Sequence, residues 1–207
     1  MTIQWYGATC IKLTTSEATI VIDPYGSETG LKLPRLTADV VAATRKSLSV
    51  SAVGALAGGT GPFVIDGPGE YEIKKTFVYG VPIAGGTEPL TLYLIEAEGI
   101  SIGHLGSLDH QLANGELERF EGVDVLCIPV GGHGSLNADG AADIISAIEP
   151  RIVIPMQYKL PGLKQALDPI SVFAKEMGVK ESEQVEKLKI SHKDLPQDNM
   201  QVVLLKP

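Results

Sequence analysis

The segment at residues 123–156, VDVLCIPVGGHGSLNADGAADIISAIEPRIVIPM, decides the fold. Its two apolar runs, residues 123–130 and 151–156, are rich in Val and Ile and predict buried strands. Between them, Asn137 precedes a stretch with the composition of a helix, and Pro150 ends it. The segment therefore predicts a strand, a covering helix and a second strand.

Outward from this unit, strands dominate the first half of the chain. Runs bounded by Gly, Ser and Pro predict strands at residues 2–6, 10–14, 18–22, 39–43, 63–65, 76–79, 91–97 and 100–104. We expect helices at 51–57, 114–120 and 164–177, a tight connection at 66–72, and closing strands at 184–190 and 201–205. This order favours an α/β (α+β) chain of two sheets packed face to face with helices outside, forming a single domain over residues 1–207.

Composition and charge exclude several classes of protein. With 44% hydrophobic and 20% charged residues, the chain predicts a packed globule. Its 17 basic and 25 acidic residues give a net charge of −8, which opposes nucleic-acid binding. No apolar run approaches the ~18 residues that span a bilayer, so we expect no membrane contact and a cytoplasmic location. Cys10 and Cys127 lack metal or redox spacing and predict buried free thiols.

Several apolar strands end in loops that carry Gly, Pro or His. Three of the four histidines lie in such loops: His104 and His110 in GHLGSLDH, and His133 in GGHG. Loops at strand ends position functional groups, so a shared rim of these loops is the first candidate site. The chain has no HxH, HxxxH or CxxC spacing, and the histidines fit either hydrogen-bonded loop residues or a ligand set.

The order of segments resembles that of a known family. The matching stretches are WYGATC (5–10), TIVIDPYG (19–26), ADVVAAT (38–44), FVIDGPGEYEI (63–73), TLYLIEAEGISIGHLGSL (91–108), VDVLCIPVGGHG (123–134) and EPRIVIPMQY (149–158). Together they resemble the metallo-β-lactamase superfamily, in its branch of Zn-dependent hydrolases that includes the L-ascorbate-6-phosphate lactonase-like proteins. The resemblance implies a four-layer αββα sandwich with a Zn or Mn site at one edge.

The family's metal motif, His-x-His-x-Asp-His, follows a strand, and the resemblance places it directly after ADVVAAT. The ligand positions of the motif, of the bridging aspartate and of the last histidine hold Arg45, Ser47, Ser49, Val50, Ser107 and Gln157. Because these side chains are not the family's ligands, we expect no metal cofactor. The remaining candidates for a pocket lining are Asp23, His104, His110 and His133, of which Asp23 and His104 match the family pattern.

Two main functional hypotheses follow. The first is a non-catalytic descendant, a pseudoenzyme whose old metal rim binds a small molecule, a protein partner or nothing. The second is a hydrolase with a rebuilt site, which uses His104, His110 and His133 with Asp109 around one ion, or a serine nucleophile such as Ser47 or Ser107. A structural role through a homo-oligomeric surface is the remaining alternative.

Overall fold

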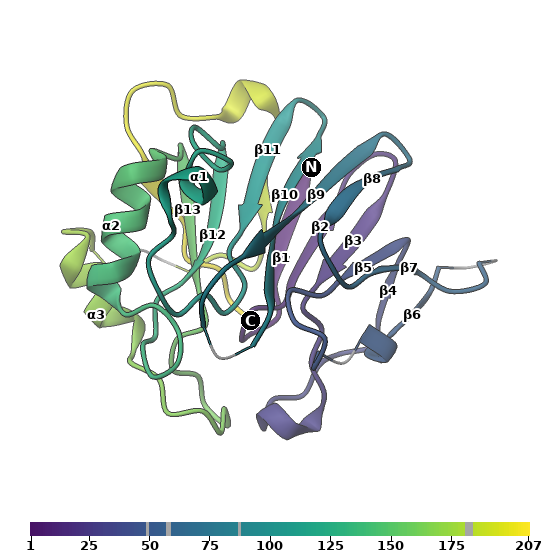
Figure 1. The fold of residues 1–207 in the computed structure, drawn as a ribbon, viewed down its shortest axis with the longest axis horizontal. Helices are drawn as coiled ribbons and strands as arrows, with labels where there is room; N and C mark the ends of the chain where they lie inside the picture. Colours follow the sequence, from purple (N-terminus) through teal and green to yellow (C-terminus); the bar gives the residue numbers. More distant parts are fainter. Residues whose placement is uncertain (49, 57–58, 87, 181–183) are drawn as a thin grey trace.

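The computed structural model describes residues 1–48, 50–56, 59–86, 88–180 and 184–207, and its centre is a pair of β-sheets packed face to face (Figure 1). Within this part of the chain, one sheet has the order β14-β1-β2-β3-β5-β7 and the other β15-β13-β12-β11-β10-β9-β8. The first comprises β1 (Thr2–Trp5), β2 (Ile11–Thr14), β3 (Thr19–Ile22), β5 (Val40–Ala42), β7 (Phe63–Ile65) and β14 (Leu188–Lys189). The second comprises β8 (Gly69–Ile73), β9 (Thr76–Ile83), β10 (Leu90–Ala97), β11 (Ile100–His104), β12 (Val125–Pro129), β13 (Ile152–Met156) and β15 (Gln201–Val202).

Parallel pairing brings several strand ends to one edge. In the first sheet β3, β5 and β7 run parallel, with Ile22 opposite Ala42. In the second sheet β11, β12 and β13 run parallel, with His104 opposite Cys127. Since parallel strands present their carboxyl ends at the same edge of a sheet, the loops after these strands can form a common rim.

The main apolar core fills the space between the sheets and continues beneath helices α2 and α3. Its largest fully buried side chains include Trp5, Tyr93, Phe120 and Phe173. Tyr93 is also a polar link, because its hydroxyl donates to the carbonyl oxygen of Ala43 at 2.9 Å and lies 3.3 Å from that of Ile65. The core therefore combines hydrophobic burial with a phenol on β10 that is bonded to the opposite sheet.

Helices cover the outer face of the β12–β13 region, and α2 (Ala138–Ile148) packs against both β12 and α3 (Ile170–Glu176) (Figure 1). The sequence places apolar residues on one side of α2, and Ala141, Ile144, Ile145 and Ile148 are buried there. The short helix α1 (Asn114–Leu117) precedes β12. The predicted strand–helix–strand unit is thus confirmed.

The first sheet has a different cover. A second apolar cluster, which includes Cys10, Val21, Tyr25 and Val41, packs with the two-stranded sheet of β4 (Leu36–Ala38) and β6 (Val53–Ala55). The 3-10 turns η1 (Ser27–Thr29) and η2 (Val50–Ala52) accompany this sheet. The predicted pair of sheets packed face to face is confirmed, but over this sheet the described chain has the two-stranded sheet β4-β6 with 3-10 turns where the sequence predicted helices.

The predicted helix at 51–57 is wrong. The segment forms the turn η2 and then β6, whose Val53 lies opposite Leu36 in parallel pairing, while residue 57 is outside the described residues. Pairing with a distant strand outweighs the weak local helix signal of a segment that contains Gly54.

Other predicted bounds are also corrected. Helix α3 begins at Ile170, not near 164, because Pro169 in extended conformation precedes it. The predicted tight connection at 66–72 extends too far, since β8 starts at Gly69 and pairs with β9. Helix 114–120 ends at Leu117, and the strands at 184–190 and 201–205 shrink to β14, β15 and the isolated bridge Val185–Leu205. Across the described ranges, no helix is long and apolar enough to cross a membrane.

Replacing Asn137 tests the predicted helix start. Its side-chain oxygen accepts from the Gly140 amide at 2.9 Å, so Asn137→Ala leaves that amide without its cap. We expect the free energy of unfolding to fall by about 1 kcal/mol in urea denaturation. The exposed Ser146→Ala in the same helix serves as the control, and an equal loss in both variants would contradict the capping role.

Candidate functional site

Three strand ends at the rim turn through an unusual backbone conformation. Asp23 follows β3, His133 lies after β12 and Gln157 follows β13, and each has a φ of 51°. Ala8, in the loop between β1 and β2, has a φ of 47°. Left-handed conformations are costly for residues other than glycine and concentrate at functional loops. Four of the eight non-glycine residues with positive φ in the described chain therefore lie in these loops.

Asp23 and Thr44 join the ends of two neighbouring strands. The Asp23 carboxylate is buried, and it accepts from the Thr44 amide and from the Thr44 hydroxyl, both at 2.7 Å. Burial raises the pKa of Asp23, while His104 and the hydrogen bonds from Thr44 and Thr9 act in the opposite direction. Thr44 also explains why residue 106 is a glycine, because a Cβ at that position would lie 2.8 Å from the Thr44 hydroxyl oxygen.

His104 links β11 to the loop after β1. It is fully buried, its Nδ1 accepts from the Gly106 amide at 3.2 Å, and its Nε2 lies 2.9 Å from the Thr9 carbonyl oxygen. A carbonyl can only accept, so these partners assign the proton to Nε2 and a neutral ring. Burial lowers the pKa of His104, and the Asp23 charge opposes that shift. Both ring nitrogens are engaged in holding the loop.

Arg45 and Ser107, two of the positions that the resemblance assigned to metal ligands, contact one another. Arg45 donates from Nε to the Ser107 hydroxyl at 2.9 Å and from Nη2 to the Ser107 carbonyl at 3.3 Å. Its Nη1 donates to the carbonyl of Glu88 at 3.1 Å. The structure thus brings these two predicted residues together around a permanently charged guanidinium.

The other predicted ligand positions differ from one another in burial and in the type of side chain. Gln157 is 6% exposed, its backbone amide donates to the Ala8 carbonyl at 3.0 Å, and its side-chain Oε1 has no hydrogen-bond partner within the described ranges. Ser47 is exposed, Val50 begins η2, and Ser49 lies outside the described residues. A carboxamide oxygen and an exposed hydroxyl are weak donors for zinc compared with imidazole, thiolate and carboxylate.

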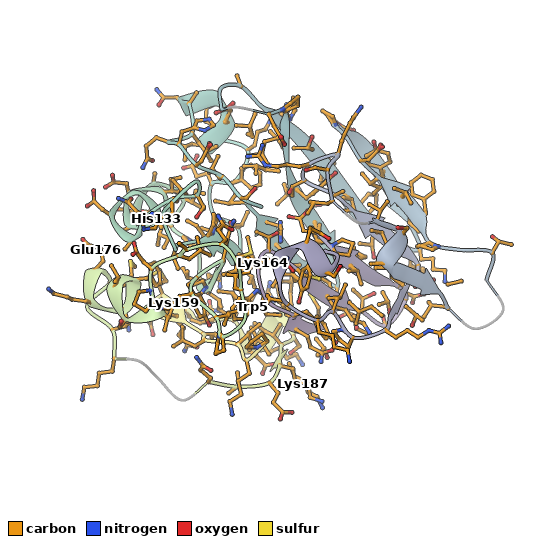
Figure 2. All side chains as sticks on the ribbon, turned by 90° about the horizontal axis from the view of Figure 1, so that it is seen from below. Trp5, His133, Lys159, Lys164, Glu176 and Lys187 are labelled. Atoms are coloured by element: carbon orange, nitrogen blue, oxygen red, sulfur yellow. The ribbon has the colours of Figure 1, made fainter. Side chains whose placement is uncertain are left out.

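Two of the predicted histidines share a separate cavity of about 380 Å³ with Asp109. His110 Nδ1 lies 2.7 Å from Asp109 Oδ1, and His110 Nε2 lies 3.0 Å from the Ala84 carbonyl oxygen. Both partners only accept, which favours the doubly protonated ring, and Asp109 raises the pKa of His110. His133 is largely exposed on the loop before α2 (Figure 2), and its Nε2 lies 3.6 Å from Asp168 Oδ1. His104 is not among the residues that line this cavity.

The donor set does not fit the family's metal group. Across the residues that the structure describes, no cluster of three or more His, Cys, Asp or Glu side chains is arranged to hold an ion. The rim instead presents a guanidinium, hydroxyls, a carboxamide and a neutral histidine whose nitrogens are both engaged. These groups match hydrogen bonding better than coordination of a divalent transition metal.

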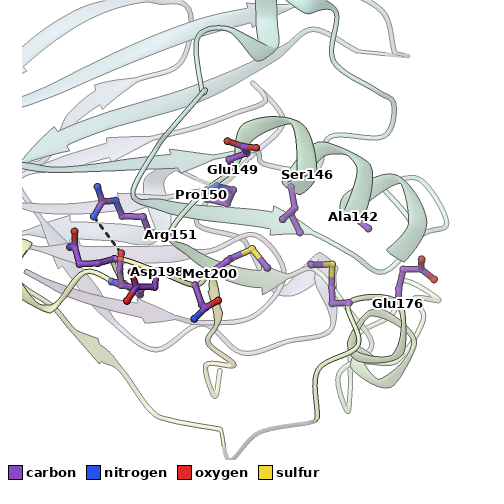
Figure 3. Close-up of a pocket in the computed structure, with 13 residues that line it drawn as sticks. Ala142, Ser146, Glu149, Pro150, Arg151, Glu176, Asp198 and Met200 are labelled. Carbon is purple, nitrogen blue, oxygen red and sulfur yellow. Dashed lines mark hydrogen bonds between the residues drawn. The ribbon is translucent and has the colours of Figure 1, made fainter.

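A larger cavity of about 680 Å³ lies away from the rim. It is lined by the end of α2, the end of α3 and the segment at 196–200, where Arg151 donates to the Pro196 carbonyl at 3.4 Å (Figure 3). None of the predicted site residues lines it. Sequence reasoning also missed Thr44 at the rim, although its place directly after an apolar strand was the available signal.

Comparison with known proteins supports the same fold. Residues 2–157 match the family described as the Beta-lactamase superfamily domain. A UPF0173 metal-dependent hydrolase of Lysinibacillus sphaericus is 25% identical over 205 residues, covering 80% of this chain and 88% of that protein. A UPF0173 protein of Pyrococcus furiosus is 42% identical over 66 residues, which span 32% of this chain and 30% of the relative's length.

Solved structures agree with this match. The crystal structure of a Thermotoga maritima protein, described as a Zn-dependent hydrolase of the metallo-β-lactamase superfamily, aligns with a TM-score of 0.82 and 29% identity over 99% of both chains. Igni18, a metallo hydrolase of Ignicoccus hospitalis, aligns with a TM-score of 0.65 and 16% identity over 92% of this chain and 99% of its own. The second likeness bears on the fold alone.

The two buried or paired histidines give opposite pH dependences. Because the pKa of His104 is lowered, its contribution to stability is present above pH ~6.5 and is lost as the pH falls through the folded pKa. Because the pKa of His110 is raised, its contribution is present below pH ~6.5 and is lost as the pH rises through the folded pKa. Urea unfolding of His104→Gln and His110→Gln should flatten the acidic and the alkaline side of the profile, respectively. Profiles that match the wild type in shape would disprove these assignments.

The cysteines should be inert in the native protein. Cys10 and Cys127 are free and fully buried, and burial raises the pKa of Cys127 to about 12 and that of Cys10 well above its usual value. We expect a disulfide reagent at pH ~8 to label neither thiol before unfolding, because the thiolate is the reactive form. After addition of urea, both should react. A full equivalent of labelling in the folded state would contradict the burial of these thiols.

Proposed function

The chain belongs to the β-lactamase superfamily, and we propose that within this family it acts as a metal-independent binding protein that does not hydrolyse by the family's metal chemistry. The observation that carries the proposal is the contact of Arg45 with Ser107 at the rim. The other support is the character of the side chains around them, which are hydrogen-bonding groups with few metal donors.

The charge of Arg45 opposes a metal at this place. Zinc is bound by deprotonated donors at roughly 2.0–2.3 Å, whereas a guanidinium stays protonated and has no lone pair to give. A divalent ion about 4 Å from the guanidinium would be repelled by roughly 8 kcal/mol at an effective dielectric constant of about 20. Arg45 is tied by three hydrogen bonds to Ser107 and Glu88, so moving it aside would break them.

Hydrolysis without a metal lacks an activating group beside the rim serine. Bulk water has a pKa of about 15.7 against about 7 for zinc-bound water, so the family's nucleophile depends on the ion. Within the described ranges, the bonding partner of the Ser107 hydroxyl is Arg45 Nε, which donates and cannot take a proton. The half-buried Arg45 is better suited to bind a ligand that carries a carboxylate or phosphate group.

The rebuilt-hydrolase hypothesis receives partial support from the second cavity. Asp109, His110 and His133 line it together, but both nitrogens of His110 already contact acceptors and His104 lies elsewhere. A metal there would have to displace the Asp109 and Ala84 contacts of His110. We therefore favour the binding role.

Metal analysis of tag-free protein tests the proposal. We expect well under one equivalent of Zn, Mn or Fe after dialysis against each metal, because the rim lacks its donors. The positive control is a variant that restores the family motif through Arg45→His, Ser47→His, Ser49→Asp, Val50→His, Ser107→Asp and Gln157→His. If that variant folds by circular dichroism, it should retain about one equivalent or more. One or two equivalents in the wild-type protein would overturn the proposal.

A further inference from the structure

The outer face of β8, β9 and β10 carries two rows of matched side chains. Register pairs Glu70 with Tyr79 and Tyr79 with Leu94 across the three strands. The next row on the same face pairs Glu72 with Phe77 and Phe77 with Glu96. Directly opposite residues in antiparallel strands are neighbours on one face of a sheet. Acidic side chains therefore flank two aromatic rings.

This face is open, and part of it forms a groove of about 470 Å³. Phe77 is 39% exposed, while Tyr79 and Leu94 are half-buried. Strands β8 to β10 and the segment after α1 line the groove, which includes Glu118 and Arg119. Helices α2 and α3 lie over the other end of the same sheet, toward β12 and β13 (Figure 1). The described chain thus leaves an apolar strip with a charged border.

The border is strongly negative. Glu70, Glu72 and Glu96 are exposed, and none has an ion pair or hydrogen bond within the described part of the chain. Desolvation, and after it the charges of Glu96, Glu70 and Glu72, raise the pKa of the Tyr79 phenol. Arg119 is the single basic residue that lines the groove among the described residues. The field on this face attracts cations and repels phosphate and carboxylate groups.

We propose that this face binds a lysine- or arginine-containing segment of a partner protein. Long basic side chains would lay their apolar stems on Tyr79, Val81 and Leu94 and pair their charged ends with Glu70, Glu72 and Glu96. A cation over the Tyr79 ring gains a further electrostatic attraction. A neutral apolar partner would instead bury three unpaired carboxylates, which is unfavourable. The inference is independent of the rim and of its ligand.

A labelled peptide provides the test. Fluorescence anisotropy with a fluorescein-labelled octapeptide of alternating lysine and threonine should report saturable binding at low salt, with glutamine replacing lysine in the control peptide. The variant Glu70→Gln, Glu72→Gln, Glu96→Gln should bind about tenfold more weakly, the order expected when three exposed charge pairs are lost. Tyr79→Thr should weaken binding severalfold with no change in charge.

A matched variant separates this site from the net charge of the protein. Asp143→Asn, Glu176→Gln, Glu186→Gln removes the same number of charges at exposed positions on other elements and should bind as the wild type does. Equal weakening in both triple variants, or equal binding of both peptides to the wild type, would overturn the proposal. So would a self-associating wild type that becomes monomeric only when Glu70, Glu72 and Glu96 are replaced, because the occupant would then be a second copy of the chain.

Discussion

The buried carboxylate of Asp23 is the constraint on which the rim depends. Its oxygens hold Thr44 at the end of β5, and Thr44 in turn sets the space that only Gly106 can occupy. His104 extends the connection from β11 to Thr9. Since a buried carboxylate without donors is unfavourable, the loop after β5 supplies them through the amide and hydroxyl of Thr44. Because Arg45 directly follows Thr44, the hydrogen bonds of Thr44 to Asp23 also fix the position of the Arg45 backbone.

A rim of this kind can outlast the chemistry it supports. Asp23 and His104 brace the strand ends through hydrogen bonds to other loops, so their role in stability does not require an ion. Arg45, Ser107 and Gln157 occupy positions at which the resemblance expects ligands, and two of them satisfy one another. Under the proposed binding role, the contact of Arg45 with Ser107 holds these loops without an ion. In this view the fold and the reaction are separable properties of the same set of loops.

Local signals explain what the sequence predicted well. The start of α2 follows from Asn137, whose cap involves a residue only three positions away. The segment at 51–57 failed because its structure depends on pairing with Leu36–Ala38, which local propensity does not encode. At the site, the resemblance placed Arg45 and Ser107 at one rim, but their contact spans 62 positions in the chain and depends on packed sheets. His104 and His110 are close in sequence, but His104 is fully buried and His110 lines a separate cavity. The packing of the whole fold, not their spacing, keeps them apart.

The phenol of Tyr93 has a mechanical consequence for the sandwich. Apolar surfaces can slide past one another at little energetic penalty as long as they stay covered, but the Tyr93 hydroxyl lies against two carbonyl oxygens of the facing sheet. A shift by one residue would separate the Tyr93 hydroxyl from the Ala43 carbonyl in a dry interior, whereas the Ile65 carbonyl keeps its hydrogen bond from the Ala43 amide at 2.8 Å. Tyr93 therefore opposes shear between the two layers, close to Ala43 and to the neighbouring bond from the Thr91 amide to the Thr44 carbonyl at 2.9 Å.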